Sequence, residues 1–125
     1  MKINYLGGRG EPLLMIHGWG VNSKIWISLV DELKFFTSVY VVDLPGMGGS
    51  SSISPYTLDN LAKEIKANVP IKKCSILGWS LGGQVAMSMA IRMPESIEKL
   101  ILMSSTPCFV EKKDWSYGVN KQFFL

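Results

Sequence analysis

The chain has 125 residues, of which 47% are hydrophobic and 18% are charged, and its formal net charge is +3. This length is ordinary for one domain with its own core, and the composition excludes a disordered chain. The charges are spread along the sequence, so we expect no nucleic-acid partner. No apolar run is long enough to cross a membrane and no signal-peptide core follows Met1, so we expect a cytoplasmic protein without a membrane partner.

The cysteine and histidine content argues against a metal site. Cys74 and Cys108 lie far apart without a CxxC pattern, and His17 is the only histidine. Two buried free thiols are the favoured interpretation, and a disulfide stays open as the alternative. With so few candidate ligands we expect no metal ion, and we expect no other cofactor.

Strand-like apolar runs alternate with amphipathic helical stretches along most of the chain. The runs predict an outer strand and four inner strands, at residues 3–6, 13–17, 39–43, 74–78 and 99–104. The stretches between them predict three helices, at residues 22–33, 57–69 and 81–93. This alternation is typical of an α/β fold, a mostly parallel sheet with helices on both faces.

Particular residues mark the ends and faces of these helices. The first helix begins at Asn22 or Ser23, which can cap it. Its expected apolar face consists of Trp26, Leu29, Val30 and Leu33. A loop rich in Pro, Gly and Ser precedes the second helix. Thr57 opens this helix, and Pro70 stops it.

Residues 105–125 break the alternation. They carry several aromatic side chains and end on an apolar run without terminal polar residues. A native C-terminus is usually more polar than this. We therefore expect a core at about residues 11–105 and a chain that stops in the middle of an element.

The segment Gly78-Trp79-Ser80-Leu81-Gly82, between an expected strand and an expected helix, carries the strongest functional signal. A serine on so sharp a turn has a strained backbone and an exposed hydroxyl. In this strand–turn–helix context the G-x-S-x-G pattern indicates a catalytic serine. Gly78 and Gly82 remove Cβ atoms that would collide, and Gly83 extends the clearance. We interpret Ser80 as a catalytic nucleophile; the alternative is a serine that only caps the helix.

The start of the same helix offers a backbone donor. The N–H group of Leu81 has no partner within the helix, and it points toward the negative charge that develops on a reacting carbonyl oxygen. We therefore predict that Leu81 supplies one half of an oxyanion hole.

His17-Gly18-Trp19-Gly20 follows the first inner strand and predicts the other half. Gly18 and Gly20 permit a sharp turn that aims the N–H of Trp19 into the site, while the Trp19 ring shapes an acyl pocket. The alternative is a plain turn with a core tryptophan. His17 is not expected to be the general base, because a histidine at this place locks the loop and no histidine follows Ser80.

Asp43 opens the glycine-rich stretch 43–50 at the end of another expected strand. It precedes the serine in the chain, so we interpret it as a structural residue that accepts hydrogen bonds from loop N–H groups and not as a catalytic acid. The stretch lacks the G-x-x-x-x-G-K pattern of a phosphate loop.

Together these motifs resemble the α/β-hydrolase superfamily over roughly residues 13–105. The segments 17–20, 43–50 and 78–83 match its oxyanion loop, post-strand loop and nucleophile elbow in order. In that superfamily the triad acid and histidine follow the serine, so the resemblance places both beyond Leu125. It also implies that residues 1–125 are the N-terminal portion of one α/β-hydrolase domain, with 106–125 leading to a lid, and that they turn over no substrate alone.

Within the superfamily the chain is similar to the pimeloyl-[acyl-carrier protein] methyl ester carboxylesterases of biotin synthesis. The particular features are Trp79 in the elbow and the segment 105–109 followed by Trp115. This resemblance implies a serine carboxylesterase that forms an acyl-enzyme on Ser80 from a small acyl ester, carried by an acyl-carrier protein; we expect a monomer.

Two alternatives remain open at this point. One keeps the fold and changes the chemistry to that of a C–C hydrolase, a peptidase or a haloperoxidase-like enzyme. The other is a non-catalytic fragment, in which the strand at 99–104 is an uncovered apolar edge of the kind that aggregates.

Overall fold

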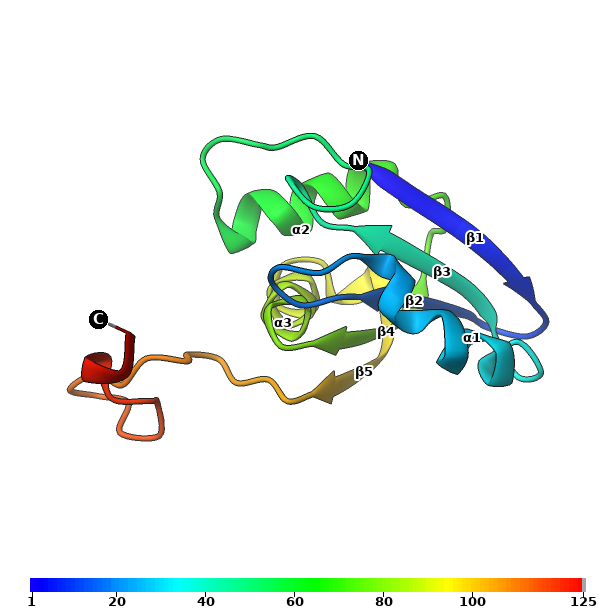
Figure 1. Cartoon of the computed structure of the whole chain (residues 1–125). Helices are drawn as coiled ribbons and strands as arrows, with labels where there is room; N and C mark the ends of the chain where they lie inside the picture. Colours follow the sequence, from blue (N-terminus) through cyan, green and yellow to red (C-terminus); the bar gives the residue numbers. More distant parts are fainter. Residues whose placement is uncertain (125) are drawn as a thin grey trace.

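The computed structural model describes residues 1–124, which form a five-stranded sheet with helices on both faces (Figure 1). The strands are β1 (Lys2–Gly8), β2 (Pro12–Ile16), β3 (Ser38–Asp43), β4 (Cys74–Trp79) and β5 (Ile97–Met103). Their order is β1-β3-β2-β4-β5; β1 is antiparallel to β3, and the other neighbours are parallel. The predicted α/β fold with a mostly parallel sheet is confirmed.

The helical segments are η1 (Ser23–Trp26), α1 (Ile27–Leu33), α2 (Leu58–Asn68), α3 (Leu81–Arg92), η2 (Pro94–Ser96) and η3 (Lys121–Phe124). The first predicted helix is thus a 3₁₀ turn, capped by Asn22, that continues as a short α-helix. Trp26 and Val30 are buried as predicted, but Leu29 is 38% exposed, so its placement on the apolar face is wrong. Trp26, Val30 and Leu33 keep the i, i+4 and i+7 spacing of an α-helix, and Leu29 lies at the border of the face that they form.

Alternate residues of the strands feed two hydrophobic clusters, one on each face of the sheet. Leu14 and Ile16 of β2 pack with residues of α2 and α3. Leu13 and Met15 point the other way and pack under Trp26 of η1. Successive side chains of a strand point to opposite faces, so a strand that is covered on both faces is apolar throughout.

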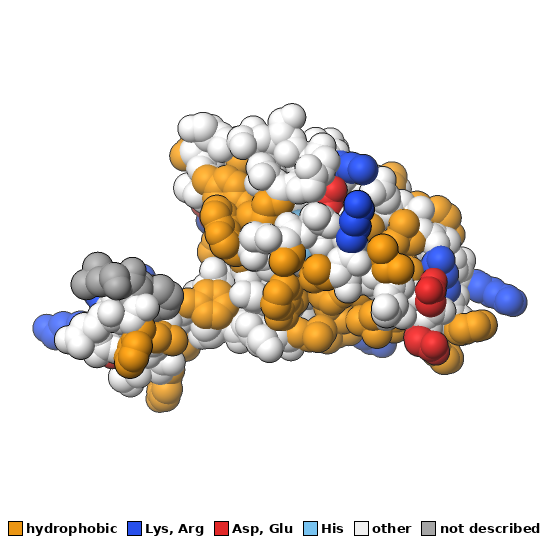
Figure 2. Space-filling view, viewed as in Figure 1, with side chains coloured by type: hydrophobic (Ala, Val, Ile, Leu, Met, Phe, Trp, Pro, Cys, Tyr) orange, Lys and Arg blue, Asp and Glu red, His pale blue; other side chains and the backbone are white. Residues whose placement is uncertain are grey.

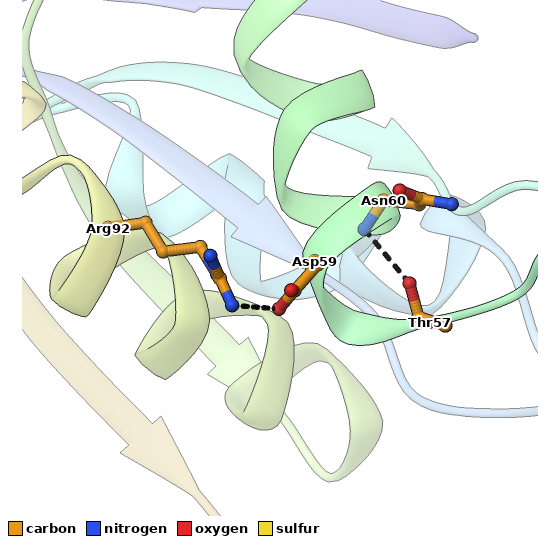
Figure 3. A network of polar contacts seen from close by, with 4 residues as sticks. All are labelled: Thr57, Asp59, Asn60 and Arg92. Carbon is orange, nitrogen blue, oxygen red and sulfur yellow. Dashed lines mark hydrogen bonds and ion pairs between the residues drawn. The ribbon is translucent and has the colours of Figure 1, made fainter.

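Helices α2 and α3 are joined at their ends by polar contacts (Figure 3). The Thr57 hydroxyl accepts the Asn60 N–H at 3.2 Å, which confirms the predicted start of α2. Asp59 in the first turn of α2 forms an ion pair with Arg92 in the last turn of α3. Both side chains are roughly half exposed, so this pair adds little to stability.

Beyond β5, residues 104–124 leave the sheet and add no strand to it (Figure 1). Within residues 1–124, β5 pairs with β4 alone, and its residues Leu100–Met103 are 36 to 45% exposed. The predicted exposed apolar edge is therefore present in this chain. No helix in the same range is long and apolar enough to span a membrane.

Neither cysteine forms a disulfide, and Cys74 is buried as predicted, but the predicted burial of Cys108 is wrong because it lies partly exposed in the segment beyond β5. Burial raises the pKa of the Cys74 thiol to about 11, so this thiol stays protonated and acts as a small apolar core residue. Residues 1–124 contain no group of three or more His, Cys, Asp or Glu side chains placed to hold a metal ion.

Candidate active site

Ser80 stands between β4 and α3, at the carboxyl end of a central strand. Its backbone has φ of 54° and ψ of −118°, a conformation that residues with a side chain rarely adopt. Its N–H donates to the Met103 carbonyl at 3.0 Å, and its carbonyl accepts the Ser105 hydroxyl at 2.8 Å. The Ser80 side chain makes no capping hydrogen bond to α3, which contradicts the alternative of a plain helix cap.

Three glycines create the space that this turn needs. A Cβ atom on Gly78 would lie 2.5 Å from the carbonyl oxygen of Gly82. A Cβ atom on Gly82 would collide with the Ile16 carbonyl of β2, and one on Gly83 would collide with the Ser105 side chain. The start of α3 therefore lies closer to the sheet than any larger residue permits.

The loop that follows β2 packs directly against the turn. A Cβ atom on Gly18 would lie 3.1 Å from the Cβ of Ser80 and 2.9 Å from the Trp79 ring. β2 and β4 are parallel neighbours, so their carboxyl ends meet at one edge of the sheet. Leu81 occupies the first position of α3, where an N–H has no acceptor within the helix. The two backbone segments predicted to supply oxyanion donors are thus adjacent.

Trp19 is 69% exposed, so the alternative of a core tryptophan is wrong. Its ring contacts Tyr56 edge to face, with 5.9 Å between the ring centroids. The two rings border an open cavity of about 360 Å³, which we call the Trp19 cleft. It is lined by Trp19, Gly20, Pro45, Gly46, Met47, Ser52, Ile53 and Tyr56.

Tyr56 is the residue of this region that the sequence analysis missed. Burial raises the pKa of its hydroxyl, which therefore stays neutral at ordinary pH. The available signal was its position directly before Thr57, the cap of a helix that begins at the same edge of the sheet. An aromatic side chain at that place is close to the loops that follow β2 and β3.

His17 is fully buried, and both of its ring nitrogens are hydrogen-bonded. Nε2 accepts the Leu44 N–H at 2.9 Å, so Nδ1 carries the proton and donates to the Gly18 carbonyl at 2.7 Å. Burial lowers the pKa of His17 although the Gly18 hydrogen bond and the Asp43 charge oppose it. The neutral ring ties the loop after β2 to the loop after β3, and neither nitrogen is available to take a proton from Ser80.

Asp43 is buried at the end of β3. Its two carboxylate oxygens accept the Ser23 N–H and the Gly49 N–H, each at 2.9 Å. Burial alone would raise the pKa of Asp43, but these hydrogen bonds outweigh it and hold the pKa below its usual value. Gly48 has φ of 54°, and a Cβ atom there would collide with this carboxylate. Asp43 thus organises the glycine-rich loop around itself.

The model of the alpha/beta hydrolase fold family matches residues 11–124. The chain belongs to this family. The pimeloyl-[acyl-carrier protein] methyl ester esterase of Nitrosomonas europaea is 41% identical over 113 residues, and that of Wigglesworthia glossinidia brevipalpis is 40% identical over 117. These alignments cover 90% and 94% of this α/β-hydrolase chain but 44% of each relative, so the chain spans less than half of their length.

Solved structures of α/β hydrolases agree with the fold. An esterase from Exiguobacterium antarcticum superposes with a TM-score of 0.83 at 26% identity, covering 97% of this chain and 47% of that esterase. A marine microorganism esterase superposes with a TM-score of 0.75 at 30% identity, covering 81% of this chain and 40% of its own.

Proposed function

We propose that the protein is a serine carboxylesterase that hydrolyses pimeloyl-[acyl-carrier protein] methyl ester in biotin synthesis. The observation that carries this proposal is the strained backbone of Ser80, whose side chain caps nothing and stands beside the Gly18–Trp19 turn. The relatives at about 40% identity are pimeloyl-[acyl-carrier protein] methyl ester esterases. Their names favour this ester as the substrate, and favour ester hydrolysis over the C–C hydrolase, peptidase and haloperoxidase-like alternatives. The proposed enzyme is a cytoplasmic monomer that uses no metal or organic cofactor.

The proposed reaction proceeds through an acyl-enzyme. Ser80 Oγ bonds to the ester carbonyl carbon while the N–H groups of Trp19 and Leu81 donate to the carbonyl oxygen. The serine proton passes to a histidine base and from there to the departing methoxy group, which leaves as methanol. Water then releases the acid from Ser80 by the same steps.

The base and its acid partner are proposed to come from the additional length that the relatives possess. His17 is the only histidine of this chain, and its two ring nitrogens already hold loop groups. The 125 residues by themselves are therefore proposed to be inactive, with residues 106–125 leading toward the part that carries the lid.

The test uses the complete coding sequence in a biotin-requiring bacterial strain that lacks its own esterase. We expect the wild-type gene to restore growth without biotin. We expect Ser80→Ala to abolish it, because loss of the nucleophile lowers kcat by about 10⁴-fold or more. Ser88→Ala on the same helix is the matched control and should behave as the wild type. Restored growth with Ser80→Ala would overturn the assignment of the nucleophile.

A further inference from the structure

We propose that Ser105 is a positioning residue for the ester hydrolysis, and that its hydroxyl sets the direction in which the Leu81 N–H group points. This inference rests on the proposed esterase function and adds to it a residue that touches no reacting atom. It is carried by the geometry of the peptide between Ser80 and Leu81, by the hydrogen bonds of that peptide's carbonyl group, and by the way Ser105 is held.

The Ser80 carbonyl and the Leu81 N–H belong to one rigid peptide unit. In a planar trans peptide, the C=O of one residue and the N–H of the next point in opposite directions. A side chain that fixes this carbonyl therefore fixes the oxyanion donor as well. The Ser80 ψ angle, which orients the unit, is −118° and not the helical value of about −42°, so contacts from the surroundings must hold it.

Three donors hold the Ser80 carbonyl. The N–H groups of Gly83 and Gln84 donate to it from within α3, at 2.9 and 3.3 Å. The Ser105 hydroxyl donates to it from outside the helix at 2.8 Å, the shortest of the three distances. The helix donors hold the carbonyl along the helix axis, and the hydroxyl restrains it across that axis. Without this hydroxyl, the peptide unit can tilt, and the donor on its other side tilts with it.

The Ser105 side chain is itself fixed against the first turn of α3. Gly83 leaves the space for it, since a Cβ atom on Gly83 would collide with the Ser105 side chain. One residue later, the Gln84 side chain donates to the Thr106 carbonyl at 3.1 Å. The hydroxyl of Ser105 is therefore presented to the Ser80 carbonyl by contacts on both sides of it.

The segment that carries Ser105 lies on the body of the molecule, directly after β5. Its first bond to the elbow is the one from the Ser80 N–H to the Met103 carbonyl, at 3.0 Å. The residues that follow, 108–124, project from the body as a separate lobe (Figure 2). Within residues 1–124, the Ser105 hydroxyl makes the only side-chain hydrogen bond to the Ser80 backbone. Its removal is therefore the sharpest change that tests this restraint.

The experiment measures kcat and KM of the complete protein for p-nitrophenyl butanoate. We expect Ser105→Ala to lower kcat roughly tenfold and to leave KM within about twofold, because an oxyanion donor acts in the transition state. Loss of a whole donor lowers kcat by about 10²–10³-fold, and here the donor remains but is misaligned. Ser105→Thr keeps the hydroxyl and should recover most of the lost kcat.

Ser38→Ala is the matched control. The Ser38 hydroxyl also donates to a backbone carbonyl, that of Gly10 at 2.9 Å, but Ser38 begins β3, at the opposite end of the parallel strands from the elbow. We expect both alanine variants to lower the urea midpoint by similar amounts, and Ser38→Ala to keep the wild-type kcat. A hydrogen bond that only stabilises the fold would give both variants the same kcat.

A trifluoromethyl ketone provides a second measurement at the same atoms. Ser80 Oγ bonds to its carbonyl carbon, the carbonyl oxygen becomes an alkoxide that accepts the Leu81 N–H, and the serine proton passes to the histidine base. This adduct resembles the transition state. We expect Ser105→Ala to raise the inhibition constant by about the factor by which it lowers kcat.

The outcomes separate the role of Ser105 from the function on which it rests. A Ser105→Ala variant with the kcat of Ser38→Ala, or with the inhibition constant of the wild type, would overturn the positioning role and leave the esterase function standing. If Ser105→Ala does not fold, Ser105→Cys, a weak donor of nearly the same shape, takes its place. A wild-type protein that does not hydrolyse the ester would overturn the esterase function itself.

Discussion

Residues around Ser80, and not its own side chain, hold its backbone in the positive-φ conformation. Hydrogen bonds from the β5 segment fix its N–H and carbonyl groups, and glycines let α3 approach β2. At this scale the site depends on the absence of Cβ atoms at the neighbouring glycines as much as on the hydrogen bonds made by the Ser80 backbone.

A single added methyl group at Gly82 tests this dependence. We expect Gly82→Ala to lower the free energy of unfolding by about 2 kcal/mol or more, because the new Cβ meets the Ile16 carbonyl of a central strand. Urea denaturation of the complete protein measures the change. Ser88→Ala, on the same helix, should stay within about 0.5 kcal/mol of the wild type; an equal loss in both variants would contradict the collision.

His17 predicts a pH dependence of stability. Its pKa is lowered in the folded chain, so the unfolded chain binds a proton at higher pH, starting near its ordinary pKa of about 6.5. Stability is therefore complete above about pH 6.5 and declines as the pH falls toward the folded pKa. Asp43, whose folded pKa is also lowered, adds a separate loss only below about pH 4.

Denaturation midpoints of wild type and His17→Gln between about pH 7.5 and pH 5 check this window. We expect the wild-type midpoint to fall with pH. The His17→Gln variant should be less stable at neutral pH, since it disturbs two buried hydrogen bonds, and nearly flat over the same range. A wild-type midpoint that does not change between these values would show that the neutral ring is not what the fold requires.

At the scale of elements, the sequence predicts three inner strands and the two long helices best. β2, β3, β4, α2 and α3 each lie within one residue of the predicted bounds, because apolar patterns and flanking Gly, Pro, Ser or Thr mark them. β5 begins two residues earlier than predicted, at Ile97, where the register with β4 extends it. Strand order and the antiparallel direction of β1 depend on pairing between distant segments, which local patterns do not encode.

The same distinction applies to the candidate site. Ser80, Gly18 and the glycines of the elbow can be found from sequence, because each follows from the local geometry of one turn. The Trp19 cleft could not be found, since Tyr56 approaches Trp19 only after β2, β3 and α2 have assembled. The exposure of Leu29 was missed for another reason: its i, i+3 position fits the apolar spacing, and the spacing does not show where the buried face ends.

β5 leads to a prediction about association of the chain by itself. Its apolar residues are partly exposed and, within residues 1–124, its outer edge pairs with no strand, so we expect the 125-residue chain to self-associate at micromolar concentrations and above. Ile101→Lys should reduce this association, because a charge on an edge strand opposes pairing. Sedimentation velocity measures the change.

Ile27→Lys is the matched control, since Ile27 is 55% exposed and lies beside β1 and β3, at the opposite edge of the sheet from β5. It should associate as the wild type does. Equal dissociation by both variants would mean that added charge, and not the edge of β5, controls association.

For the whole molecule, the chain holds the proposed nucleophile and both proposed oxyanion donors within less than half the length of its relatives. A serine hydroxyl without a base is a weak nucleophile. We therefore expect a fluorophosphonate probe to label the 125-residue chain slowly and the complete protein rapidly, with Ser80→Ala abolishing the label in the complete protein. Mass spectrometry locates the modified residue, and rapid labelling of Ser80 in the short chain would show that a base is already present within it.

The two hydrogen bonds of His17 couple the loop after β3 to the turn beside Ser80. The ring fastens Leu44, next to the Pro45 wall of the cleft, to Gly18, next to the Trp19 wall and against Ser80. The loop after β3 is therefore connected through one imidazole to the turn predicted to donate to the oxyanion. Substitutions that displace Leu44 are expected to lower kcat as well as stability, although Leu44 touches no reacting atom.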